Sequence, residues 1–367
     1  MMFSFNELDV SKKRVELAKQ ALVDNKIDAT VFFDADRYGR KFALTAAYTA
    51  FVLFPNKDPI VIAHSIDKDH AESETHLEIV EIRDTNKLKD SLRLQLPKET
   101  NRRQKVAVVP WNAKFDKVQI LEELNCDIVD ASENVLPYCL KKPFPEEIEA
   151  IRKLSWICDK GLEAASNAVE PNLLENEVAA EVNYAIEKAG ATELAFPTLV
   201  ASGNRAAFPH GWTSHKKINE GDVVVVDIGP VLGGYDGCVC RTFMAGGGKE
   251  WRKEIEVVQE AIHKSLDLLK NQKTASAAQI DRVSRQVVRK HGYRIWPNMK
   301  TVWTGHPIGG YASPTIAPYS KDKIEESMVF AVEPAIYIKG RGGVRIEHHI
   351  LAKKHGYEIL DRFPERP

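Results

Sequence analysis

Three polar residues in the C-terminal half of the chain are of types that bind metal ions. Asp227 ends an apolar run in DVVVVDIGP, His306 lies beside a glycine turn in TGHPIGG, and Glu333 precedes a proline in AVEP. Carboxylates and imidazoles are common ligands of divalent cations. Taken singly, each residue also has an ordinary structural explanation, since Asp227 and Glu333 suit strand ends and His306 suits a turn. Only their combination supports a functional prediction.

The elements around these residues predict an α+β domain. DVVVVDIGP and MVFAVEPAIYI are strand candidates, and a helical stretch around residues 250–291 separates them. Two amphipathic helices precede these strands. One lies in residues 140–161, after a proline break, and the other in residues 173–190. We therefore predict that a C-terminal domain covers residues 140–367.

The preceding part of the chain predicts a smaller α/β domain, residues 1–139. Apolar side chains recur at helical spacing from residue 10 to about residue 24. Short runs rich in β-branched and aromatic residues follow, and they are bounded by Asp, Asn, Lys and Pro. The predicted strands are residues 29–35, 50–55, 59–64 and 105–110.

Composition excludes several classes of protein. A chain of 367 residues exceeds one ordinary domain of roughly 100–200 residues, which favours two domains. Lys plus Arg number 51 against 52 Asp plus Glu, so no basic excess favours a nucleic-acid or lipid partner. The N-terminus lacks a signal-peptide pattern, and no apolar run approaches the ~20 residues needed to span a membrane. We expect a cytoplasmic protein whose five irregularly spaced cysteines are reduced.

Six segments, in order and spacing, resemble the creatinase/aminopeptidase P/prolidase family, whose members share the pita-bread fold. The resemblance implies an α/β N-terminal creatinase-like domain and an α+β C-terminal pita-bread (creatinase/aminopeptidase) domain. The N-terminal part matches only in length and α/β character, so it rests on analogy. The segments are PFPEEIEAIRKLSWICDKG, FPTLVASGNRAAFPHG, INEGDVVVVDIGPVLGGYDGCVCRTF, TGHPIGG, ESMVFAVEPAIYI and GGVRIEHHILAKKHG.

The resemblance also implies a set of metal ligands. Peptidases of this family hold two divalent cations, commonly Mn, Co or Zn, with two Asp, one His and two Glu. Such a pair lowers the pKa of a shared water and polarises the scissile carbonyl. Four family positions are filled here, by Asp227, His306, Glu333 and Glu347.

The fifth family position, a second Asp, is Cys238 in this chain. A thiolate is a soft ligand that favours zinc over manganese. Asp236, Cys238 and Cys240 alternate along one strand and so face the same side, which allows a shifted or a mixed ligand. Alternatively, Cys238 and Cys240 are simply small buried residues. The prediction is therefore one or two cations per chain, or none if the site is degenerate.

Family positions for substrate handling are also only partly filled. The histidine of the family's Pro-His motif is His210, and Arg345 precedes Glu347 as in the family, so the resemblance implies catalytic roles for both. Two further family histidines are replaced by Ser313 and Val302. Neither replacement offers an imidazole.

Three functions remain open. The first is a metal-dependent hydrolase that resembles Xaa-Pro aminopeptidase or dipeptidase and acts on short proline-containing peptides. The second is a catalytically impaired relative that acts as a binding protein. The third is a hydrolase of a small non-peptide amide. The resemblance further implies a homodimer.

Overall fold

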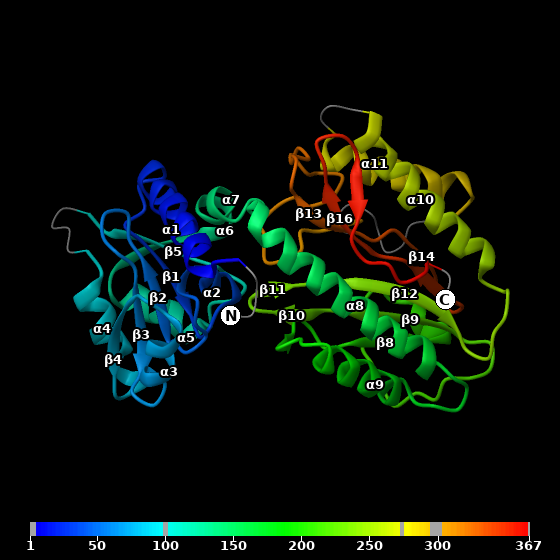
Figure 1. The fold of residues 1–367 in the computed structure, drawn as a ribbon, viewed down its shortest axis with the longest axis horizontal. Helices are drawn as coiled ribbons and strands as arrows, with labels where there is room; N and C mark the ends of the chain where they lie inside the picture. Colours follow the sequence, from blue (N-terminus) through cyan, green and yellow to red (C-terminus); the bar gives the residue numbers. More distant parts are fainter. Residues whose placement is uncertain (1–4, 98–101, 272–274, 294–302, 366–367) are drawn as a thin grey trace. The chain divides into compact units, whose positions relative to one another are not determined.

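The chain divides into two compact units, residues 1–141 and residues 142–367 (Figure 1). The sequence-based prediction puts this division after residue 139. The computed structural model describes residues 5–97, 102–271, 275–293 and 303–365.

The first unit contains a six-stranded sheet in the order β4-β3-β2-β1-β5-β6. The pairs β1–β2 and β2–β3 are antiparallel, and the pairs β3–β4, β1–β5 and β5–β6 are parallel. Its strands are β1 (Ala29–Phe33), β2 (Ala50–Leu53), β3 (Ile60–His64), β4 (Glu78–Ile82), β5 (Gln104–Val108) and β6 (Cys126–Asp130).

Helices pack on both faces of this sheet because successive strand side chains alternate between faces. Val31 and Phe33 pack with Leu88, Leu92 and other residues in one core cluster. Phe32 points the other way and stacks on Phe42 of α2 at 5.7 Å between ring centroids. The helices of this unit are α1 (Glu7–Asp24), α2 (Arg37–Ala43), α3 (Lys68–Glu74), α4 (Leu88–Gln95), α5 (Phe115–Glu123), α6 (Ala131–Asn134) and α7 (Leu136–Cys139).

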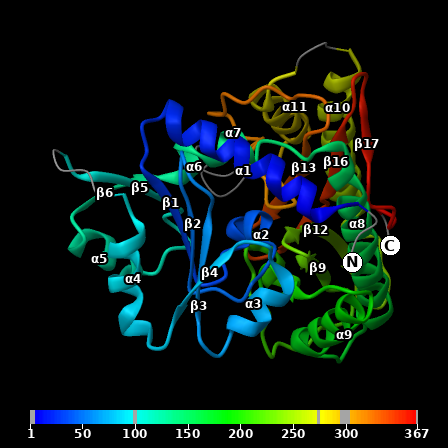
Figure 2. The same ribbon diagram turned by 60° about the vertical axis from the view of Figure 1, so that its left-hand side comes forward.

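In its described residues, the second unit contains four small sheets with helices packed around them (Figures 1 and 2). The sheets have the orders β11-β10-β7, β12-β9-β8, β13-β16-β17 and β14-β15. Their strands are β7 (Glu193–Leu194), β8 (Leu199–Ser202), β9 (Val223–Ile228), β10 (Pro230–Leu232), β11 (Tyr235–Asp236), β12 (Val239–Met244), β13 (Val329–Val332), β14 (Ala335–Ile338), β15 (Gly342–Arg345), β16 (His348–Ala352) and β17 (Tyr357–Ile359).

Two pairs of helices cover these sheets. Helices α8 (Ile148–Ala168) and α9 (Glu175–Lys188) lie side by side, and so do α10 (Arg252–Asn271) and α11 (Ala277–Lys290) (Figures 1 and 2). The second pair shares a core with strands β9 and β12–β16. Ser276 begins α11 through a capping box with Gln279, which satisfies backbone groups that the first turn leaves open.

The structure confirms most of the predicted elements and corrects three of them. The predicted helical stretch 250–291 is two helices, α10 and α11. MVFAVEPAIYI is also two strands, because Pro334 cannot donate to a sheet and the chain breaks between β13 and β14. The alternation predicted for Asp236, Cys238 and Cys240 is interrupted, since β11 ends at Asp236 and β12 begins at Val239.

Among the described residues, no helix combines the length and the apolar character that a membrane crossing requires.

Candidate metal centre

His306 and Glu333 are brought together by two extended segments that run antiparallel. The N–H of Ala331 donates to the carbonyl of His306, and the N–H of Glu333 donates to the carbonyl of Thr304, both over 2.8 Å. Gly305 lies between them, where a Cβ atom would come within 2.2 Å of the Ala331 carbonyl oxygen. Glycine is therefore required for this close approach.

Glu347, Asp227 and Cys238 come from a second set of strands. Glu347 lies between β15 and β16, and its N–H donates to the carbonyl of Cys240 over 3.0 Å. Cys240 in β12 is the register partner of Asp227 in β9. Cys238 occupies the break before β12. The sheet registry therefore places the three side chains close together.

The ligand atoms of Cys238, His306 and Glu347 lie within 4.8 Å of one another. Nε2 of His306 is 3.3 Å from Oε1 of Glu347 and 3.8 Å from Oε1 of Glu333. Sγ of Cys238 is 3.5 Å from Oε2 of Glu347 and 3.7 Å from Oδ1 of Asp227. The five residues thus form one contiguous cluster.

Burial and mutual repulsion shift the protonation of this cluster. Burial, together with the charge of Glu333, raises the pKa of Glu347 to about 7. Burial opposes a charged His306, but the carboxylates of Glu347 and Glu333 outweigh it and raise its pKa to about 10. Burial and the same carboxylates raise the pKa of the Cys238 thiol well above its usual range. A proton on His306 compensates the acidic groups.

The cluster fits a divalent cation. Oε1 of Glu347 is buried; it lies 3.3 Å from Nε2 of His306 but has no partner in hydrogen-bond geometry among the residues that the structure describes. Nδ1 of His306 lies 3.0 Å from the carbonyl of Pro307 and donates to it, which leaves Nε2 to face the carboxylates. This arrangement is typical of metal-binding histidines. The donors are a thiol, an imidazole and carboxylates, a set that suits zinc best.

Arg345 is buried and holds Asp227. Its Nη2 donates to Oδ2 of Asp227, and its Nη1 donates to the carbonyl of Pro209 over 2.8 Å. A further bond of 3.2 Å reaches the hydroxyl of Tyr337. Arg345 therefore fixes one candidate ligand and also the residue before His210.

The remaining predicted residues lie around this cluster or outside the described residues. His210 is exposed. Its positive charge lowers the pKa of Glu333 and so opposes the effect of burial on that carboxyl group. Asp236 is not in the group formed by Cys238, His306 and Glu347. Ser313 is buried. Val302 lies outside the described residues.

No role is predicted for His349 from the sequence, but the structure places it beside Cys238. The N–H of Cys238 donates to Nε2 of His349 over 3.0 Å, and Nδ1 of His349 lies 2.8 Å from the hydroxyl of Ser155 in α8. The sequence offers one signal for this position. His349 follows Glu347 by two residues, and residues two apart in an extended chain point to the same side. His348 faces the other way and contacts Asp361.

Comparisons with known proteins show which proteins this chain resembles. The model of metallopeptidase family M24 matches residues 149–354. The Xaa-Pro dipeptidase of Pyrococcus furiosus is 37% identical over 220 residues, which are 59% of this chain and 62% of the relative. That of Pyrococcus horikoshii is 38% identical over 220 residues, 59% of this chain and 61% of the relative. The chain thus spans less than two thirds of the length of these relatives.

Solved structures are similar over a larger part of the chain. Prolidase from Pyrococcus furiosus has a TM-score of 0.79 at 26% identity and covers 94% of this chain and 99% of its own. X-Pro aminopeptidase from Thermotoga maritima has a TM-score of 0.78 at 26% identity, with 96% of this chain and 98% of its own covered. The pita-bread fold predicted from the sequence is confirmed by these likenesses.

Proposed function

The chain belongs to metallopeptidase family M24, and from this membership we propose that it is a metal-dependent peptidase that cleaves the bond before proline in short peptides. The observation that carries the proposal is the convergence of Cys238, His306 and Glu347, whose ligand atoms lie within 4.8 Å of one another. The relatives named Xaa-Pro dipeptidase and prolidase supply the substrate class.

Cys238, His306 and Glu347 would hold a divalent cation, with Glu333 and Asp227 beside them. When a cation is bound, the site gains a Lewis acid that polarises a carbonyl group and activates water for attack. We expect zinc to bind better than manganese, because Cys238 replaces a carboxylate with a soft sulfur donor. A single cation per chain is the simplest occupancy for this ligand set.

Glu333 is suited to proton transfer. Its carboxylate is partly exposed and lies 3.8 Å from Nε2 of His306, and burial raises its pKa above the ordinary value, which favours a group that can take up a proton. Oε1 of Glu333 would accept a proton from the attacking water and return it to the departing proline nitrogen.

Arg345 and His210 act on the substrate side of the cluster. Arg345 orients Asp227 and, through the carbonyl of Pro209, the turn that carries His210. Exposed His210 would donate to the substrate carbonyl or to the leaving amine. A bond before proline lacks an N–H, so a site that acts on the carbonyl suits this substrate. Ser313 offers a hydroxyl where the family has an imidazole, and we expect slower turnover.

Two further expectations accompany this proposal. A cytoplasmic location agrees with five free cysteines, and a homodimer follows from the family resemblance. Light scattering after size-exclusion chromatography measures the oligomeric state directly.

The test is metal analysis beside a cleavage assay. Protein purified without chelator is reloaded with Zn, Mn or Co, analysed by plasma mass spectrometry, and incubated with Xaa-Pro dipeptides and tripeptides. We expect bound zinc and cleavage, with both lost in His306→Ala and retained in the distant variant His355→Ala. Bound metal without cleavage of either peptide would overturn the proline-specific peptidase.

One observation favours a second candidate, a binding protein that has lost catalysis. The pKa of the Cys238 thiol is raised by burial and by nearby carboxylates, so the free thiol resists the deprotonation that metal binding requires. Absence of metal after reloading, together with no turnover, would favour this candidate over the peptidase.

A further inference from the structure

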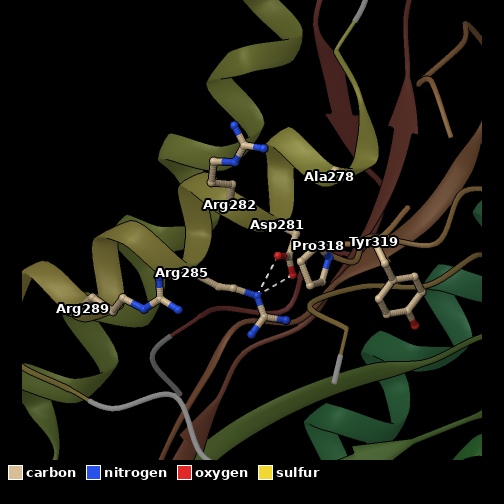
Figure 3. A pocket seen from close by; sticks show the side chains of 7 residues that line it. All are labelled: Ala278, Asp281, Arg282, Arg285, Arg289, Pro318 and Tyr319. Atoms are coloured by element: carbon tan, nitrogen blue, oxygen red, sulfur yellow. Dashed lines mark hydrogen bonds and ion pairs between the residues drawn. The ribbon is translucent and has the colours of Figure 1, made fainter. Parts of the chain in front are cut away.

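A pocket of about 480 Å³ lies along helix α11, and no residue of the candidate metal centre lines it (Figure 3). One wall is the helix itself, and the other is a loop that contains a proline and a tyrosine. Its lining residues are Ala278, Asp281, Arg282, Arg285, Arg289, Pro318 and Tyr319.

Three arginines on one face of α11 line this pocket. Arg282, Arg285 and Arg289 follow a spacing of three and four residues, which places them on the same side of a helix. Arg282 and Arg289 are separated by about 10 Å along the axis, from a rise of about 1.5 Å per residue. Both are exposed, whereas Arg285 is buried.

The charges in the pocket are only partly compensated. Asp281 is the acidic residue of the lining, and both of its oxygens accept from Nε of Arg285, at 2.8 and 2.6 Å. Figure 3 shows this pair at the centre of the pocket. Within the described part of the chain, the side chains of Arg282 and Arg289 make no hydrogen bond or ion pair. Among the described residues, these two positive charges therefore have no carboxylate partner.

On the neighbouring helix α10, three surface cations have acidic partners. There Arg252 lies 3.3 Å from Glu256, Lys270 lies 3.0 Å from Asp267, and Lys264 pairs with Glu260. Helix α11 has a single acidic residue, Asp281, and it is already occupied by Arg285. Helix α11 therefore offers no second carboxylate of its own to Arg282 or Arg289.

From this excess charge we propose that the pocket binds a small phosphate-bearing molecule. Guanidinium groups match phosphate oxygens with two parallel hydrogen bonds. A phosphate monoester carries about −1.5 to −2 charge near pH 7, so it compensates the excess positive charge of the pocket better than a single carboxylate does. The exposed ring of Tyr319, beside Pro318, adds a flat wall against which the organic part of the ligand can pack.

The design of a test must leave the buried pair intact. Asp281 also accepts from the hydroxyl of Thr304 over 2.9 Å, and the carbonyl of Thr304 accepts from the N–H of Glu333. Replacing Arg285 would therefore disturb the candidate metal centre as well. Arg282 and Arg289 are exposed, and their replacement breaks no hydrogen bond or ion pair among the described residues.

The experiment is isothermal titration calorimetry on the full, metal-loaded chain at fixed ionic strength. The probes are inorganic phosphate, adenosine monophosphate and adenosine. We expect both phosphate-bearing probes to bind, adenosine not to bind, and the double variant Arg282→Gln/Arg289→Gln to lose affinity by roughly tenfold or more. Lys290→Gln, an exposed change on the same helix outside the pocket, should bind as the unmodified chain does.

The variant His306→Ala distinguishes phosphate binding in this pocket from phosphate binding at the metal centre. Retained phosphate binding in His306→Ala, with loss in the double arginine variant, supports the pocket even if the chain shows no peptidase activity. Binding that is lost in His306→Ala but unchanged in the double arginine variant overturns the proposal. No saturable binding to the unmodified chain, or equal binding of adenosine and adenosine monophosphate, overturns it as well.

Discussion

The backbone N–H of Cys238 donates a hydrogen bond to Nε2 of His349 over 3.0 Å. Burial lowers the pKa of His349 to about 4, so the imidazole is neutral near pH 7 and can accept this bond at Nε2. Its Nδ1 must then carry the proton and donate to the hydroxyl of Ser155, which in turn donates to the carbonyl of Ile151. A chain of hydrogen bonds thus ties Cys238, in the break between β11 and β12, to helix α8.

Replacing His349 with alanine should weaken metal binding although His349 is not itself a proposed ligand. Loss of a residue that orients a ligand typically lowers metal affinity by about 10–100-fold. Competition with a chromophoric zinc chelator measures the change, and His349→Gln, which keeps an acceptor, should recover part of it. Unchanged zinc affinity in His349→Ala would show that the bond to Cys238 does not position the thiol.

The stability of the metal-free protein should fall as the pH rises above about 6.5. The pKa of His306 is about 10 in the folded protein against an ordinary value of 6.5, so between these values the folded state binds more protons than the unfolded state. The stabilisation from this proton is complete below pH 6.5 and is lost as the pH approaches 10. Thermal unfolding of chelator-treated protein across this range measures the loss.

The control for the pH prediction is His306→Gln. This variant cannot titrate at position 306, so the alkaline loss of stability should be smaller than in the unmodified chain. Saturating zinc should also flatten the dependence, because a bound cation replaces the proton as the compensating charge. A pH profile identical in the variant and the unmodified chain would contradict the assignment to His306.

Replacing Cys238 with aspartate should shift the metal preference from zinc towards manganese and cobalt. A carboxylate is a harder ligand than a thiolate and can bridge two cations. We expect the metal content to rise from ~1 to ~2 per chain, as in two-cation hydrolases, with faster cleavage of Xaa-Pro dipeptides in manganese. Plasma mass spectrometry and initial rates provide the measurement.

Cys238→Ser is the matched control for Cys238→Asp. It removes the sulfur at nearly constant volume without adding a negative charge, so it should lower zinc content and leave manganese content low. If Cys238→Asp behaves like Cys238→Ser, the thiol is a buried structural residue and the cation, if any, is held by the other ligands.

The sequence predicts the helices and strands that have strong local patterns. Helix α8 follows a proline break and has a regular apolar face, and β9 is a run of four valines before Asp227. Such patterns depend on neighbouring residues along the chain, which the sequence displays directly. Strand β4 is not predicted, because its side chains are mostly exposed or partly buried and its pattern is weak.

The details of the site depend on contacts between residues that lie far apart in the chain. Cys238 and His349 are separated by more than a hundred positions, and no local pattern pairs them. The break at Cys238 is not predicted because an alternating pattern continues through it, although the structure ends β11 at Asp236. The partner of Arg345 is equally hidden in the sequence, since Asp227 faces it only after β9, β12 and β15 come together.

The buried pair of Arg345 and Asp227 should contribute to stability as a unit. Removing one partner of a buried ion pair leaves an uncompensated charge and costs about 3–5 kcal/mol, so Arg345→Met and Asp227→Asn should each destabilise the metal-free chain strongly. The double variant should lose less than the sum of the two losses, because neither charge then remains unpaired. Urea unfolding of the unmodified chain, the two single variants and the double variant measures the coupling between Arg345 and Asp227. As a control, Arg252→Met breaks an exposed pair with Glu256 and should lower the free energy of unfolding by only about 0–1 kcal/mol. Additive losses in the double variant would show that Arg345 stabilises the fold through Pro209 and Tyr337 rather than through Asp227.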